Sequence, residues 1–108
     1  MTRQQLVRAR SVHPHRRLQM FGMSDQFSSV EKKMHHEMME AKGDTTAETW
    51  IKKMIAHHQG AIDMSRVLLD NSDHGPTRAM AQKTIDEQQK DINELADMLV
   101  QHQAELRS

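Results

Sequence analysis

Methionine and histidine dominate the side chains of this 108-residue chain that could carry chemistry, with ten Met, eight His and no cysteine. Thioether sulfur is a soft ligand that selects copper(I) and, by the same softness, silver(I), whereas imidazole serves many metals. The lack of cysteine excludes disulfides, zinc–thiolate sites and thiol catalysis. A competing interpretation is that flexible methionine side chains only fill gaps in helical cores. The way these residues cluster has to decide between the two interpretations.

Two clusters and one pair bring these residues together. Residues 34–39 read Met-His-His-Glu-Met-Met, so their Met and His side chains recur four residues apart, on one face of a helix. Residues 54–64 hold two Met and two adjacent His, with small Ala61 leaving space beside an imidazole. Met98 and His102 form a further pair four apart, which a solvated helix end would explain equally well. The predicted metal ligands are Met34, His35, Met38, Met39, Met54, His57, His58, Met64, Met98 and His102.

Three helices are predicted to position these ligands. Ser24 suits the N-cap of the first helix, and Gly43 its C-terminal stop. Thr45 and Glu48 have the spacing of a capping box, which opens a second helix that ends near residue 69 or 70. After a turn at residues 71–75, Pro76 suits the first position of a third helix. The fold class is therefore all-α, an antiparallel helical bundle over residues 24–108, preceded by a flexible basic tail at residues 1–23.

Apolar seams at four- and three-residue spacing predict how the helices pack. The second helix carries two neighbouring seams, Ile51, Ile55, His58, Ile62, Ser65 and Leu69, and Trp50, Met54, His57, Ala61, Met64 and Leu68. The third carries Ala81, Ile85, Gln88, Ile92, Leu95, Leu99, His102 and Leu106. In an antiparallel pair with a short turn, residues equidistant from the turn lie at one level, and this rule applied to both turns gives the expected layers. One layer holds Met34, Met54, His57 and Gln88, the next holds Met38, Met98 and Trp50, and His102 lies beyond it.

Gln88 has an expected role in that first layer. Reaching across from the third helix, it is expected to hydrogen-bond the second ring nitrogen of a ligating His and to fix the orientation of the ring.

Charge and length limit the partners. Fifteen Lys and Arg balance fifteen Asp and Glu, so the net charge of zero gives no electrostatic argument for nucleic acid. No apolar stretch reaches the length of a membrane span. A domain this small buries a modest fraction of its apolar surface. We therefore expect a homo-oligomer that binds metal ions, with neither nucleic acid nor membrane as a partner.

The second and third helices resemble the bacterial domain of unknown function 305 family, which includes a copper-binding protein. The residues that carry this resemblance, over roughly residues 30–104, are Trp50, Met54, His57, His58, Ala61, Ile62, Met64, Ala81, Ile85, Gln88, Asp91 and Ile92. The resemblance implies a ferritin-like antiparallel bundle, copper or silver binding, and an exported, periplasmic setting. It carries over Met54, His57, His58 and Met64 as ligands. No export signal is visible in the chain, so a cytoplasmic location is the alternative.

This chain departs from the family pattern in the third helix. Asp91 stands where the family usually has Glu, and Leu95 stands where a Met commonly follows. Met98 is the candidate to replace that missing sulfur ligand.

The predicted function is copper(I) or silver(I) binding for buffering, delivery or resistance, without catalysis. A di-iron enzyme of the ferritin-like type would need Glu-x-x-His pairs on facing helices, and no Glu precedes a His by three in these helices. Ser65 has no base and acid that the sequence positions for hydrolysis. The alternative is a structural or protein-interaction helical module, a homo-oligomer with a Met-rich core and no metal. Replacing His57 and His58 by Ala would separate the two, because only a metal protein would lose an ion.

Overall fold

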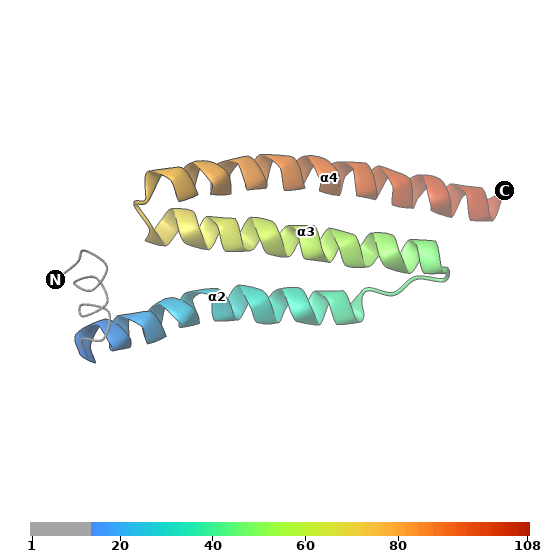
Figure 1. The fold of residues 1–108 in the computed structure, drawn as a ribbon. Coiled ribbons are helices and arrows are strands. Elements are labelled where there is room, and N and C mark those ends of the chain that lie inside the picture. The colour runs from blue at the N-terminus through green and yellow to red at the C-terminus, as the bar shows by residue number, and fades with distance from the viewer. Residues whose placement is uncertain (1–13) are drawn as a thin grey trace.

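The computed structural model describes the backbone of residues 14–108 and the side chains from residue 26 onward. This part of the chain forms three helices, α2 (Pro14–Glu40), α3 (Thr46–Asn71) and α4 (Gly75–Arg107), which run antiparallel to one another (Figure 1). The predicted all-α class and antiparallel order are confirmed. The predicted start of the first helix at Ser24 was wrong, because α2 already begins at Pro14. Proline fits the first turn of a helix, where its missing N–H needs no partner. Residues 1–13 of the predicted tail lie outside the described residues.

The caps of α3 and α4 follow the predicted signals in part. Thr45 is the N-cap of α3, and its Oγ1 accepts a hydrogen bond of 3.0 Å from Glu48 N. The Glu48 carboxylate completes the capping box one residue earlier than expected, by accepting from Asp44 N at 3.3 Å. Pro76 lies in the first turn of α4, as predicted. The hairpin between α3 and α4 therefore has the tight turn that its sequence indicates.

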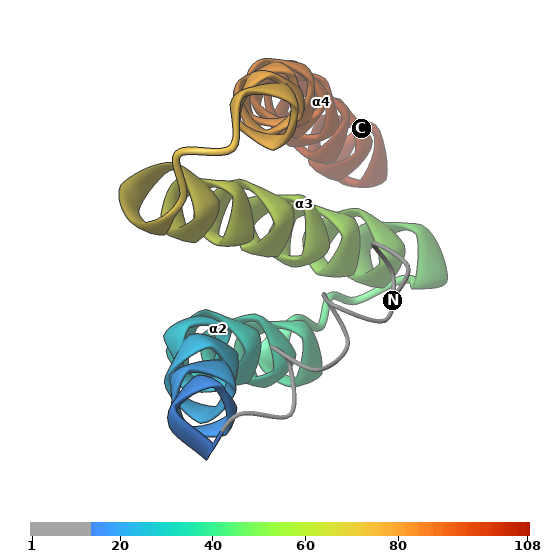
Figure 2. The same cartoon turned by 60° about the vertical axis from the view of Figure 1, so that its left-hand side comes forward.

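The three helices lie in one row with α3 in the middle. Figures 1 and 2 show α2 and α4 on opposite sides of α3, and within the described residues the two outer helices make no contact with each other. The fully or largely buried apolar side chains are Ile51, Ala56, Ile62, Ala81 and Leu95. They line the two interfaces that α3 makes. The bundle is thus an open layer, and its small core lies along α3.

The register between α3 and α4 agrees with the prediction. Trp50 and Met98 line one pocket, as expected from reflection about the turn. Further contacts keep the same register, with His58 beside Asp91 and Thr45 beside His102. Only the three residues 72–74 separate the two helices, so residues equidistant from the turn have to lie at one level.

The register between α2 and α3 differs from the prediction by more than one helical turn. Met34 packs against Gly60, and Lys33 Nζ lies 3.5 Å from Asp63 Oδ2, whereas Met34 was expected beside Met54. The same offset brings Met38 closer to the level of His57 than to that of Trp50. The cause is the link of residues 41–45, which is not helical. Figure 1 shows the link running on past the end of α2, and a non-helical residue can span about 3.3 Å against about 1.5 Å in a helix, so α3 overshoots the end of α2.

Gly43 does not act as the predicted helix stop. α2 ends at Glu40, and no described glycine has the left-handed conformation of a C-terminal cap. The absence of a side chain at Gly43 serves a close approach instead. A Cβ atom added there would lie 2.6 Å from Glu48 Cδ, so a larger residue would displace the Glu48 side chain.

Candidate metal site

A pocket between α3 and α4 brings together three of the predicted ligands. Trp50, Met54 and His58 follow one another at four-residue spacing on α3, and they face a segment of α4 that contains Met98. The cavity has a volume of about 200 Å³, and its lining is Trp50, Met54, His58, Asp91, Glu94, Leu95 and Met98. Two thioethers, one imidazole and two carboxylates therefore share one small space.

His58 is held in one orientation by the backbone of its own helix. Its Nδ1 lies 2.7 Å from the carbonyl oxygen of Met54. A carbonyl oxygen only accepts hydrogen bonds, so Nδ1 carries a proton, and in the neutral tautomer the lone pair of the ring is therefore on Nε2. That Nε2 lies 3.6 Å from Asp91 Oδ2, and the His58 side chain is only 14% exposed. In that tautomer the Nε2 lone pair faces a carboxylate oxygen, an arrangement that a cation stabilises, whether a proton on Nε2 or a metal ion.

The partner of His58 on α4 was predicted incorrectly. Gln88 was expected to hold the second ring nitrogen, but the two nitrogens lie beside the Met54 carbonyl and Asp91. Asp91 lies one helical turn beyond Gln88 on α4. Asp91 enters the sequence analysis only through the family resemblance, with no predicted contact to His58, because an apolar seam does not show which of its flanks faces an imidazole.

His57 and Met64 do not line this pocket. His57 is exposed, and its ring centroid lies 6.0 Å from that of His58 in an edge-on arrangement. Consecutive residues of a helix point about 100° apart, so only one of two adjacent His side chains can face α4. Met64 is half-buried and lies ten residues beyond Met54 along α3.

The predicted ligands on α2 lie apart from the α3–α4 pocket. Met34, His35 and Met39 line a shallow hollow whose walls come from α2 itself. Met38 is half-buried, and its carbonyl oxygen accepts a hydrogen bond of 2.5 Å from Lys53 Nζ. Since α2 and α4 make no contact in the described part of the chain, the layer does not bring these residues beside Met98.

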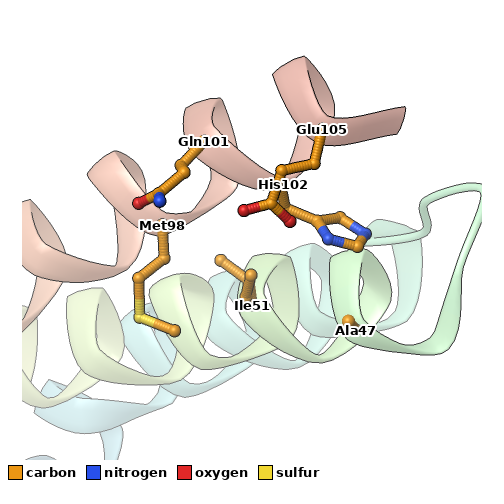
Figure 3. Close-up of a pocket in the computed structure, with 6 residues that line it drawn as sticks. All are labelled: Ala47, Ile51, Met98, Gln101, His102 and Glu105. Carbon is orange, nitrogen blue, oxygen red and sulfur yellow. The ribbon is translucent and has the colours of Figure 1, made fainter. Parts of the chain in front are cut away.

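Met98 and His102 point toward α3 but diverge from each other. Figure 3 shows both side chains descending from α4, with Ile51 between them and the His102 ring above Ala47. His102 Nε2 lies 2.9 Å from Thr45 Oγ1. This contact gives His102 a structural role, which is to fasten the last turns of α4 to the start of α3.

Glu48, which was not among the predicted site residues, forms a second contact between the start of α3 and the last turns of α4. Its side chain is buried, with 5% of the residue exposed, and Oε1 accepts from Gln103 Nε2 at 3.2 Å. The hydrogen bond from Gln103, supported by Asp44 N–H and Lys52, lowers the pKa of Glu48 below 4.5 against the opposing effect of burial. The capping-box spacing pointed to Glu48, but not to its partner 55 residues later in the chain.

Among the residues that the structure describes, no three His, Asp or Glu side chains are grouped so that they could hold a metal ion by themselves. No helix in the described range is both long enough and apolar enough to cross a membrane.

The sequence was compared with protein families, with curated proteins and with solved structures. The model of a family described as "Domain of unknown function (DUF305)" matches residues 2–99, which is most of the chain. No curated protein and no solved structure matches the sequence.

Proposed function

The chain belongs to the domain of unknown function 305 family, and we propose that it binds soft metal ions, copper(I) or silver(I), through Met54, His58 and Met98. The observation that carries this proposal is the orientation of His58, whose Nδ1 contacts the Met54 carbonyl so that Nε2 is available as a ligand in a pocket that also holds both thioethers. Binding would serve metal buffering, delivery or resistance. The protein is proposed to bind and release the ion without catalysing a reaction.

The donor set favours a soft ion over a hard one. Thioether sulfur binds copper(I) well and contributes little to ions such as Mg²⁺ or Ca²⁺, which need several oxygen ligands. Asp91 and Glu94 line the same cavity, so their negative charge supports a bound cation. The Met54 carbonyl oxygen, 2.7 Å from Nδ1, would hold the ring in place when a metal ion occupies Nε2.

The other predicted ligands stay candidates for weaker or additional sites. These are Met34, His35, Met38, Met39, His57, Met64 and His102. The resemblance noted above also supports an exported, periplasmic setting, with a cytoplasmic location as the alternative.

The test is a copper(I) titration of the full chain without a His tag, under a reductant and against a competing chelator. We expect His58→Ala to weaken the tightest site by at least about tenfold. The matched control is His57→Ala, the adjacent and exposed residue, which should leave that site unchanged. Met54→Leu and Met98→Leu remove sulfur at nearly constant volume, so each should weaken copper(I) and silver(I) without loss of helicity.

Two results would overturn the proposal. The first is a wild-type chain that cannot compete with the chelator, which would favour the helical interaction module without metal. The second is equal copper(I) affinity in wild type and His58→Ala, which would remove the α3–α4 pocket as the site.

A further inference from the structure

The open layer leaves two flanks of α3 without a covering helix. α2 packs along one side of α3 and α4 along the other. In the described part of the chain, Figures 1 and 2 show no helix on either of the two faces of the layer that these three helices form. Each flank is a stripe of α3 side chains that lies between α2 and α4. The residue composition of each stripe decides whether it is stable when exposed to solvent.

The two flanks differ sharply in polarity. Ile51 faces α4, and Gly60 faces α2. Because each residue of a helix is rotated by about 100° from the one before it, these two positions lie on nearly opposite sides of α3. One of the two stripes between them is apolar, and we call it the methionine face. The methionine face consists of Trp50, Met54, His57, Ala61, Met64 and Leu68.

The other stripe is charged and internally paired. It includes Lys52, Gln59, Asp63 and Arg66. Gln59 Nε2 donates to Asp63 Oδ1 at 3.1 Å, and Lys52 Nζ lies 3.3 Å from Glu48 Oε1. This polar stripe is suited to solvent, whereas on the methionine face Trp50 is 53% exposed. The apolar flank is therefore the one that needs a cover.

We infer that a second copy of this chain covers the methionine face. Trp50 to Leu68 spans about 27 Å of helix, and the flanking helices lie about 10 Å to either side, so the face measures roughly 540 Å² before side-chain relief is counted. Stable dimers bury about 600–1,000 Å² on each partner, and the face reaches the lower end of that range once the relief of its side chains adds to the projected area.

Charge and shape favour a second copy as the occupant. The net charge is zero, so two copies do not repel each other. The radius of gyration is 19.4 Å, against about 13 Å for a compact domain of this length. Two layers stacked through the same face form a closed, isologous assembly with a core of ordinary thickness. The inference does not depend on the proposed function, because it concerns the metal-free chain.

The test uses sedimentation equilibrium and the emission of Trp50, the sole tryptophan, on the full chain in the presence of a metal chelator. We expect the wild-type mass to be twice 12.5 kDa, with Trp50 emission shifting to shorter wavelength as the protein concentration rises. Ala61→Glu places a charge on the methionine face and should give a monomer with red-shifted emission. Arg66→Glu changes the charge by twice as much on the polar stripe and should leave the dimer intact.

Folding of each variant is checked by circular dichroism. Leu68→Lys provides a second disruption, of opposite charge, in case Ala61→Glu loses helicity. A wild-type chain that stays monomeric at high concentration overturns the inference, as does a dimer that both methionine-face substitutions leave unchanged. If the chain is a monomer whose Trp50 emission shifts to the red only after deletion of residues 1–13, then that segment is the cover and the second copy is excluded.

Discussion

The contact between Gly60 and Met34 gives a direct test of how α2 packs on α3. A Cβ atom added at Gly60 would lie 2.5 Å from Met34 Cγ and 3.0 Å from Met34 Cβ, and closer still to its sulfur. The distance to Cγ is too short for two carbon atoms and the distance to Cβ is tight, so either the Met34 side chain or α2 itself would have to move. Gly60→Ala therefore combines a local gain in the helix with a clash between helices.

The size of each effect follows from general values. Replacing glycine by alanine inside a helix gains about 1 kcal/mol. Forcing an extra methyl group into a packed interface costs about 1–3 kcal/mol. We therefore expect Gly60→Ala to lower the free energy of unfolding by roughly 0–2 kcal/mol. Met34→Ala removes the sulfur and Cγ and leaves only the tight Cβ contact, so in that background the same substitution should be neutral or raise the free energy of unfolding by up to about 1 kcal/mol.

The assay is urea denaturation followed by far-ultraviolet circular dichroism, at one protein concentration, for the four members of this double-mutant cycle. Gly75→Ala is the matched control, because nothing lies within 4 Å of a Cβ atom added there. It should be neutral or stabilising by up to about 1 kcal/mol. The reasoning is refuted if Gly60→Ala raises the free energy of unfolding in wild type, or if its effect is the same with and without Met34.

Two further predictions concern Glu48. Its pKa is lowered in the folded chain, chiefly by Gln103, so its stabilisation is present above pH 4.5 and is lost as the pH falls below that value. Glu48→Gln should therefore lower the melting temperature at neutral pH, with a deficit that shrinks on acidification, and parallel pH curves for the two proteins would contradict this. Gly43→Ala should displace the Glu48 side chain and lower the free energy of unfolding by about 1–3 kcal/mol. In a Glu48→Ala background, urea denaturation should find that cost only partly removed, because the Cβ of residue 48, 2.7 Å from the added atom, remains.

The α3–α4 hairpin could be predicted from the sequence because its turn is short. Pro76 marks the start of α4, and a turn of three residues leaves little freedom in the relative position of the two helices. The pairing of Trp50 with Met98 across the hairpin follows from this geometry alone. The apolar periodicity of α4 did not show which residue beside its seam contacts His58. Helical periodicity therefore identified Met54, His58 and Met98 but missed Asp91.

The position of α2 could not be predicted in the same way, because it depends on the conformation of the link that precedes α3. A run of five residues is compact if it coils and long if it extends, and Gly43 is compatible with both. The extended form is favoured by the Glu48 carboxylate, which accepts from Asp44 N and fills the space beside Gly43. That carboxylate is itself bound by Gln103 near the end of α4. A local pattern does not contain such a distant contact.

The polar contacts at the two ends of the hairpin explain why α3 and α4, and not the whole layer, position the candidate site. At one end, Arg78 Nη1 donates to the carbonyl oxygens of Leu69 and Ser72, at 2.5 and 2.8 Å. At the other end, the contacts of Thr45 with His102 and of Glu48 with Gln103 hold the last turns of α4. The pocket lies between these two groups of contacts. The positions of its metal-donor side chains therefore depend on contacts between α3 and α4, which do not involve α2. It follows that loosening α2 should reduce stability while the geometry of the pocket is kept, whereas releasing either end of the hairpin should change the positions of the donors themselves.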